Sequence, residues 1–340
     1  TMYVVIGRMY PEALRPKALG MLAAAWVVPG LIGPGLAGLL VEISSWRMTF
    51  WIVPLLLVIP TMLLIPELIR LPVVPSLVRP DAKKQIVAVL VAIAALALFQ
   101  AGASHVGRWP TLNILLIAIV SISAAAWATT TLMPKGFLRI APGIPAVVGM
   151  RGVVAGAFFA AEIYVPLALQ EIRGVSVALS GGVLTAATIT WFAGSWLQGS
   201  DRLKLSREQI LMIGVLMAAV GIALIPIAVF VPNSIGIAAL LASLVWGVSA
   251  FGMGICFPTL GVLLLDKSAE EQHARNSAAL QMSDSFGVII ATAIAGSLLS
   301  VASLKSNITS ATFTSIWIFC TIVALISVLF IPRIQVKVTS

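Results

Sequence analysis

Residues 144–170 read IPAVVGMRGVVAGAFFAAEIYVPLALQ, and only Arg151 and Glu162 in this stretch are charged. The apolar residues fall on every side of a helix rather than on one face, which is typical of a helix surrounded by apolar material. A bilayer core about 30 Å thick needs ~20 such residues to cross it. The stretch therefore predicts a transmembrane helix. Its length and apolar character are the criteria by which further spans are recognised in the rest of the chain.

Nine further stretches match it in length and character. The predicted spans are residues 17–41, 48–66, 85–104, 111–133, 177–198, 209–231, 235–265, 277–302 and 311–332. Membrane β-strands would be ~10 residues long with alternating polarity, so helices are favoured. The opening TMYVVIGRMYP, residues 1–11, resembles the end of an earlier helix. We expect an all-α integral membrane bundle of ten full transmembrane helices plus the end of an earlier one, in a chain that lacks its first helices.

The composition excludes several classes of protein. Of the 340 residues 60% are hydrophobic and 10% charged, whereas soluble domains have roughly 45–50% and about 25%. A mean hydropathy of +1.09 is incompatible with a soluble enzyme or a disordered chain. The net charge of +9 does not indicate nucleic-acid binding, because the basic residues lie between apolar runs. Cys256 and Cys320 lie in apolar stretches, and with only two histidines no metal site is predicted.

Lysine and arginine are divided unequally between the two sides of the membrane. Of the 21, four fall on one side: Arg47, Arg108, Arg173 and Lys305. The other 17 fall in the loops that alternate with these and in the tail, and the positive-inside rule makes that side cytoplasmic. We expect a multi-pass protein of the plasma (inner) membrane with a cytoplasmic carboxyl terminus.

Three motifs resemble those of a known family. PGLIGPGLAG at 29–38, followed by WRMTFWI at 46–52, resembles the antiporter signature in the fifth helix of the major facilitator superfamily. YPEALRPKALG at 10–20 resembles that family's link between helices four and five. GSDRLKLSR at 199–207 resembles a degenerate copy of its loop motif, and the matching residues are Gly199, Asp201, Arg202 and Arg207.

The helix count resembles the fourteen-helix drug:proton antiporter branch, in which two helices are inserted between two six-helix bundles. This implies the end of the first bundle at 1–68, a cytoplasmic linker at 69–84, inserted helices at 85–133, a second bundle at 144–332 and a cytoplasmic tail at 333–340. The resemblance implies a secondary active transporter for proton-coupled export of amphipathic or cationic small molecules. A metabolite or lipid carrier of the same fold, or a membrane sensor, is the alternative.

Partners and cofactors follow from the same resemblance. The expected partners are a small-molecule substrate, protons and the lipid bilayer, with a monomeric chain and no nucleic acid. The sequence contains no nucleotide-binding or hydrolase motif, so no enzyme activity, cofactor or metal is predicted.

The antiporter-like helix contains Gly30, Gly33, Pro34, Gly35 and Gly38. Small residues let helices approach closely in lipid, and proline interrupts the backbone hydrogen bonds. We interpret this as a bent, tightly packed helix at the interface between the two bundles, with a role in gating. Ordinary glycine packing without a role in coupling is the alternative.

Charged residues inside the membrane are costly and are functional candidates by default. Glu162 is the first candidate for proton coupling or recognition of a cation, because a poorly hydrated carboxyl group can carry a proton near neutral pH. Arg151 lies 11 residues earlier, on the same face and about 16 Å away. Tyr164 adds a polar group near Glu162. The alternatives are a structural hydrogen bond for Glu162 and snorkelling to the surface for Arg151.

Asp284, in ALQMSDSFGVII, is the second acidic residue placed inside a span. It is interpreted as part of a cytoplasmic gate or a charge pair with an interior arginine, and a satisfied polar contact near the interface is the alternative. For Asp201, Arg202 and Arg207 in the 199–207 loop, a gating ion pair and plain topology-determining charge remain equally open.

Overall fold

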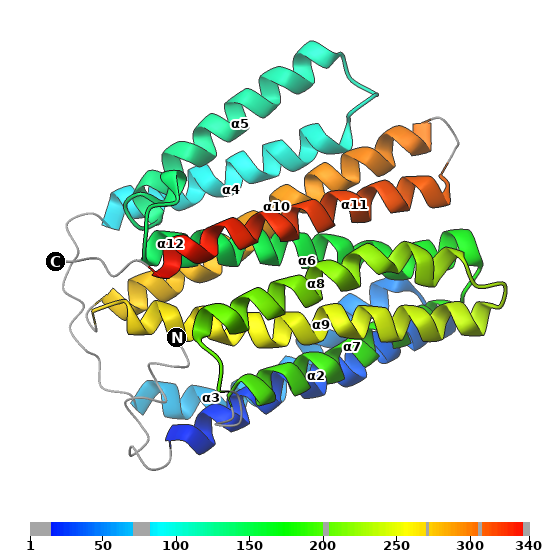
Figure 1. The fold of residues 1–340 in the computed structure, drawn as a ribbon, viewed down its shortest axis with the longest axis horizontal. Helices are drawn as coiled ribbons and strands as arrows, with labels where there is room; N and C mark the ends of the chain where they lie inside the picture. The colour runs from blue at the N-terminus through cyan, green and yellow to red at the C-terminus, as the bar shows by residue number, and fades with distance from the viewer. Residues whose placement is uncertain (1–14, 71–81, 200–203, 270–271, 305–307, 336–340) are drawn as a thin grey trace.

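The computed structural model describes residues 15–70, 82–199, 204–269, 272–304 and 308–335, which form helices and short connections without a strand (Figure 1). The long helices are α2 (Arg15–Ile43), α3 (Trp46–Arg70), α4 (Ala82–Ser104), α5 (Thr111–Leu132), α6 (Ile144–Arg173), α7 (Val177–Gln198), α8 (Arg207–Phe230), α9 (Ile235–Asp266), α10 (His273–Leu304) and α11 (Ser310–Ile326). Three short elements complete the described chain: η2 (Phe137–Arg139), η4 (Ser327–Phe330) and α12 (Ile331–Gln335).

Every predicted span lies on helical structure, and the predicted fold class is confirmed. Within the described residues, nine helices are long and apolar enough to cross a membrane, and α2 adds an apolar stretch at Pro29–Ile43. The last predicted span is not one continuous α-helix, because its end tightens into η4 before α12. Three predicted features lie wholly or mainly outside the described residues: the early helix end at 1–11, the linker at 69–84 and the tail at 333–340.

Glycine and polar residues next to the loops provide hydrogen bonds for the free backbone groups at the helix ends. Gly174 ends α6 in the left-handed conformation, and its N–H donates to backbone carbonyls of the last turn. Ser176 then caps α7 by accepting from the backbone N–H of Leu179. Ser206 and Gln209 form a reciprocal capping box at the start of α8. These caps place the helix boundaries within a few residues of the predicted ends of the spans.

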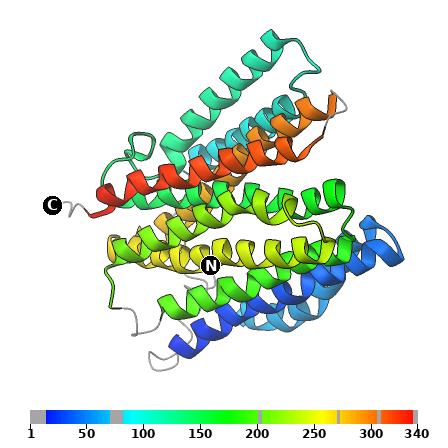
Figure 2. The same ribbon diagram turned by 45° about the vertical axis from the view of Figure 1, so that its right-hand side comes forward.

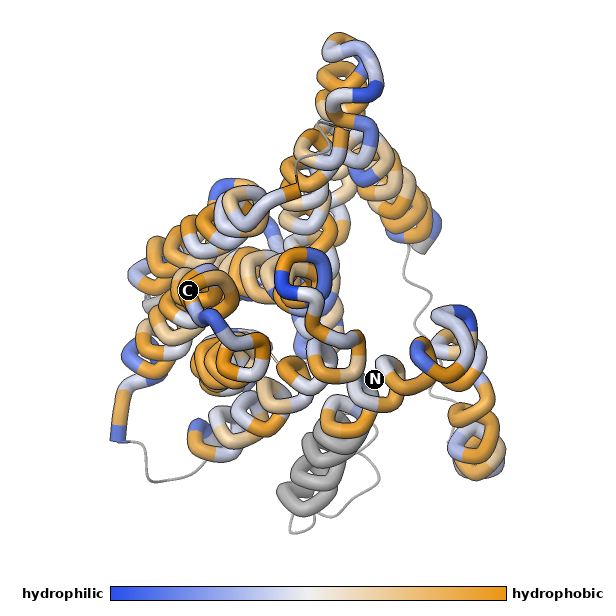
Figure 3. Tube along the Cα trace, turned by 90° about the vertical axis from the view of Figure 1, so that its right-hand side faces the viewer, coloured by the Kyte–Doolittle hydropathy of each residue, from blue (hydrophilic) through white to orange (hydrophobic). Residues whose placement is uncertain are grey.

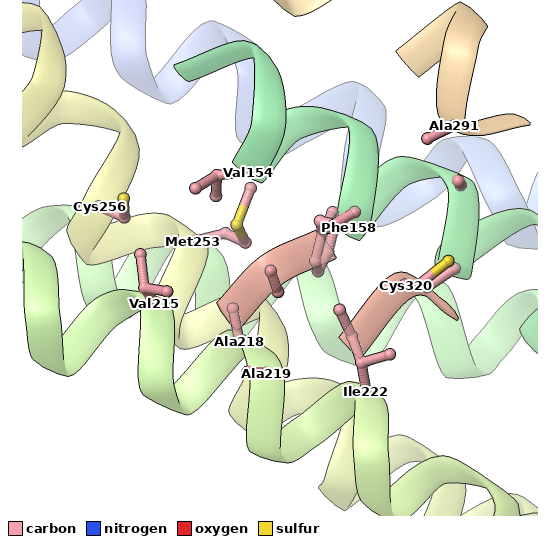
Figure 4. Close-up of a cluster of buried hydrophobic side chains, with 14 of the residues drawn as sticks. Val154, Phe158, Val215, Ala218, Ala219, Ile222, Met253, Cys256, Ala291 and Cys320 are labelled. Atoms are coloured by element: carbon pink, nitrogen blue, oxygen red, sulfur yellow. The ribbon is translucent and has the colours of Figure 1, made fainter. Parts of the chain in front are cut away.

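α6 and α9 are the most deeply buried helices, with α7, α8, α10 and α11 packed around them (Figures 1 and 2). Their apolar side chains form one continuous core. Figure 4 shows a part of it, to which these residues contribute: Val154 and Phe158 of α6, Val215, Ala218, Ala219 and Ile222 of α8, Met253 and Cys256 of α9, Ala291 of α10 and Cys320 of α11. The two cysteines are free and buried within this packing.

Glycine allows α9 to touch both of its neighbours through the backbone. A Cβ atom built at Gly254 would overlap the carbonyl oxygen of Trp191 in α7. A Cβ atom built at Gly214 of α8 would lie 2.8 Å from the carbonyl oxygen of Gly252 in α9. Close backbone contact is a common way for helices to associate tightly in lipid. Lipid tails are as apolar as the side chains, so the hydrophobic effect does not drive the helices together there.

α4 and α5 form a hairpin that stands apart from the other helices except at α10 (Figure 2). Ser297 and Ser300 of α10 donate hydrogen bonds of 3.2 Å to the carbonyl oxygens of Ala103 and Ser104 in α4. Many large apolar side chains of the hairpin are exposed. Figure 3 looks along the helices and shows that apolar residues predominate in them. Many of the large apolar side chains are exposed, as expected for contact with lipid.

Candidate functional site

The centre of the candidate site is an ion pair between α6 and α10. Arg151 Nε donates to Asp284 Oδ1 at 2.7 Å, and Arg151 Nη2 donates to Oδ2 at 3.0 Å. The two side chains are 11% and 16% exposed. A two-point contact of this kind fixes the relative orientation of both groups. Arg151 therefore does not snorkel, and for Asp284 the charge pair with an interior arginine is the alternative that the geometry supports.

Arg151 also holds α9. Its Nη1 donates to the carbonyl oxygen of Phe257 at 2.8 Å, and its guanidinium carbon lies 3.5 Å from the centre of the Phe257 ring. Pro258 follows directly and has no N–H, so the carbonyl of Gly254 lacks its helical donor. Ser195 of α7 donates to that carbonyl at 3.0 Å. One arginine thus joins three helices next to the point where Pro258 removes one backbone hydrogen bond from α9.

Close backbone packing brings the ion pair together. Gly287 of α10 lies against the carbonyl oxygen of Gly152 in α6, where a side chain would overlap it. Ser283 donates to the carbonyl oxygen of Val148 at 2.7 Å. Because Gly152 and Ser283 are next to Arg151 and Asp284 in sequence, these contacts set the distance across which the charges meet.

An aromatic cluster runs from the ion pair along α6. The Trp191 ring meets Phe257 edge-on at 5.2 Å and Phe158 at 5.5 Å between ring centres. Phe158 in turn stacks on Trp246 at 4.7 Å with an interplanar angle of 18°. Phe159 contacts Trp191 and Phe257. Trp191, Phe159 and Phe257 are half-buried, so the cluster has an open side of aromatic surface.

Glu162 lies at the other end of this cluster. It is half-buried, and its carboxylate is close enough to Trp246 to interact with the indole. The indole N–H of Trp246 is fully buried and has no hydrogen-bond partner of normal geometry among the described residues. Tyr164 is buried against α10, where a Cβ atom at Gly296 would lie 3.7 Å from its hydroxyl.

The spacing between Glu162 and Arg151 is matched in α9. Arg151 contacts Phe257 and Glu162 contacts Trp246, and the partners are also 11 residues apart on the antiparallel helix. Both residues therefore lie on the face of α6 that meets α9. The sequence spacing predicts their common face, but it gives no indication of Phe257.

The antiporter-like helix α2 packs on α7, but only some of its small residues make the contact. A Cβ atom at Gly38 would lie 2.9 Å from Ala178 Cα, and one at Gly181 would lie 2.9 Å from the Pro34 carbonyl oxygen. Gly30 lies against Thr188, which donates to its carbonyl at 3.2 Å.

The other two motif glycines behave differently. No described atom lies within 4 Å of a Cβ built at Gly33 or Gly35, so the expected close packing does not extend to these two positions among the described residues.

Glu42, which belongs to none of the sequence motifs, adds a polar contact at the same interface. Its Oε1 accepts from the backbone N–H of Ala178 at 3.2 Å. That N–H belongs to the first turn of α7, where a carboxylate is favoured by the helix dipole. An isolated glutamate at a span end gives no sequence signal for such a role.

The 199–207 loop is only partly described. Gly199 ends α7 and Arg207 begins α8, so they lie at the two ends of this connection. Asp201 and Arg202 lie outside the described residues, and the proposed gating ion pair remains a prediction.

These features define a multi-pass helical membrane protein with charges paired inside its core. The sequence profile described as Major Facilitator Superfamily matches residues 1–253, and the chain belongs to this family of membrane transporters. It is also similar to the multidrug transporter protein MdtP of Bacillus subtilis (strain 168), with 23% identity over 316 residues. That alignment covers 88% of this chain and 55% of the relative, so the chain spans about half the relative's length.

The α2–α7 contact leads to a prediction about Gly38. Gly38→Leu should weaken this interface by about 1–3 kcal/mol, the usual cost of overpacking, because the new side chain meets backbone atoms of α7. Gly35→Leu is the matched control, since no described atom opposes it. Thermal unfolding of the purified protein in detergent measures both. Equal stability of the two variants would contradict the assigned contact.

Proposed function

We propose that the protein is a secondary active transporter of the fourteen-helix drug:proton antiporter branch, exporting amphipathic or cationic small molecules in exchange for protons. Membership of the Major Facilitator Superfamily supports the transporter class. The similarity to a multidrug transporter supports the substrate type. In this proposal α2 and α3 end the first bundle, α4 and α5 are the inserted pair, and the helices from α6 onward form the second bundle. The chain functions as a monomer in the plasma membrane with a cytoplasmic carboxyl terminus.

The observation that carries the proposal is the Arg151–Asp284 pair on the face of Phe257. An ion pair inside a membrane costs desolvation energy that an apolar pair would avoid, so it favours a functional role. Asp284 is the only described group that neutralises Arg151 through a salt bridge. A proton delivered to Asp284 would remove that charge pairing and weaken the link between Arg151 and α10, while Arg151 keeps its hydrogen bond to α9.

In this proposal the aromatic cluster and Glu162 bind the substrate. Aromatic faces attract organic cations, and a nearby carboxylate adds charge complementarity. Trp191, Phe159 and Phe257 present a half-buried aromatic surface between Asp284 and Glu162. A cation bound there would interact with one acidic group while a proton occupies the other. The substrate cation and the proton could then be exchanged, because each occupies a different acidic group.

The test is transport by the complete protein in proteoliposomes. A proton gradient should drive uphill movement of a lipophilic cationic dye, and adding the dye without a gradient should move protons in the opposite direction. A protonophore is the control, because it removes the gradient without touching the protein. Dye movement that persists unchanged with the protonophore, or that needs ATP, would contradict proton-coupled secondary transport.

A further inference from the structure

A long acid-free stretch contains the α4–α5 hairpin. Between Asp81 and Glu162 the chain has no Asp or Glu. The basic residues of this stretch are Lys83, Lys84, Arg108, Lys135, Arg139 and Arg151. Arg151 is neutralised by Asp284 in the ion pair. For Lys83, Lys84, Lys135 and Arg139, the described part of the chain contains no salt bridge.

These four residues lie at one end of the hairpin. α4 and α5 pack on each other as an antiparallel pair, with Gly102 of α4 against Ile117 of α5 and with Ala88 and Ala128, near the other end, fully buried. The first turn of α4 therefore lies beside the end of α5. Lys83 and Lys84 occupy that first turn, and Lys135 is the third residue after α5. All three side chains are exposed.

The connection after α5 has a fixed shape that presents Arg139 at the same end. Gly136, with φ of 88°, opens the turn that leads into η2. Arg333 Nη1 donates to the carbonyl oxygens of Arg139 and Ile140 at 3.0 and 2.9 Å, which ties the turn to α12. Arg139 is exposed, and the neighbouring Leu138 is 57% exposed. An outward leucine between cationic side chains is typical of a segment at the membrane surface.

We propose that this end of the α4–α5 hairpin, formed by Lys83, Lys84, Lys135 and Arg139, binds the headgroup of an anionic phospholipid. The four cations lie at the end of a membrane hairpin that has many exposed large apolar side chains. Lysine and arginine at the ends of transmembrane helices reach toward the level of the lipid headgroups. The hairpin packs on the other long helices mainly through α10, so a bound lipid would reinforce the Arg333 contacts at the end opposite the Ser297 and Ser300 contacts.

Lipid binding can be measured directly on the purified protein. Native mass spectrometry would compare phosphatidylglycerol with phosphatidylcholine of matched acyl chains. Replacing all four basic residues by glutamine should lower the affinity ratio in favour of phosphatidylglycerol at least about tenfold, because each cation near an anionic lipid contributes measurably. The preference of the unmodified protein should fall with added salt, as expected for a surface charge interaction.

A control variant removes the same charge elsewhere. Lys204, Arg207, Lys267 and Arg275 lie at connections that also contain the acidic residues Glu208 and Asp266. Their replacement by glutamine should leave the preference for phosphatidylglycerol within about twofold of the starting value. The proposal is overturned if the hairpin variant keeps the preference, which would leave its charges as topology determinants. An equal loss in both variants also overturns it, because net charge alone would then explain the binding.

Discussion

Asp284→Asn should abolish proton-driven transport and destabilise the protein by about 3–5 kcal/mol. The variant leaves the Arg151 guanidinium in the core with its hydrogen bond to Phe257 but without a counter-charge. An unpaired buried charge is costly because neither water nor a partner solvates it. Denaturation of the purified protein measures stability, and dye-driven proton release from proteoliposomes measures coupling.

A double variant separates the structural and functional roles of the pair. Arg151→Met with Asp284→Leu removes both charges, and such replacements of buried ion pairs are often neutral or stabilising. We expect its stability to return to within about 1 kcal/mol of the starting protein while proton coupling remains absent. Coupled transport by the double variant would show that the pair is only structural. Normal coupling in Asp284→Asn would exclude this carboxyl group as the proton carrier.

Glu162→Gln should also abolish or uncouple proton-driven export, but with little loss of stability. Glutamine keeps the size and hydrogen-bonding capacity of the side chain and cannot exchange a proton. The side chain therefore keeps its place beside Trp246. Proton release on addition of substrate, measured between about pH 6 and pH 8, distinguishes the two roles.

Glu171→Gln is the matched control for Glu162. It makes the same chemical change on α6, but at an exposed position in the last turn. Coupling should be unaffected by it. If Glu162→Gln behaves like Glu171→Gln, Glu162 is a structural residue and the proton role falls to Asp284 or to another part of the protein.

The helices could be predicted from the sequence because each span is long and apolar. Hydropathy determines which residues enter the bilayer, and that preference does not depend on the neighbours of a helix. The end at Ser327–Phe330 could not be predicted, because the tighter helical turn there depends on packing rather than on composition. The same limit applies to the hairpin connection at Gly136, whose shape is tied to Arg333 across the fold.

Of the residues in the candidate site, only the charged ones could be predicted from the sequence. Arg151, Glu162 and Asp284 are conspicuous because they are charged residues in apolar spans. The pairing of Arg151 with Asp284 joins positions 133 residues apart, and no local pattern encodes it. Phe257 gives no signal, since a phenylalanine in an apolar span is ordinary.

The α2 motif shows a related limit. Gly30, Pro34 and Gly38 follow a four-residue spacing and share one side of the helix, whereas Gly33 and Gly35 point elsewhere. The four-residue spacing predicts that these three residues share one side of α2. It does not predict that α7 packs against that side.

The glycine contacts of α9 have a mechanical consequence. Where backbones touch, as at Gly254 against α7 and Gly252 against Gly214, one helix cannot rotate or slide past another without collision. We expect α7, α8 and α9 to move together as one rigid unit, the α7–α9 unit. α10 touches α9 much less extensively. The Gly152–Gly287 contact joins α6 and α10 in the same way. Displacement is therefore concentrated between the α7–α9 unit and the α6–α10 pair, and Arg151 of α6 crosses this joint through its hydrogen bond to Phe257.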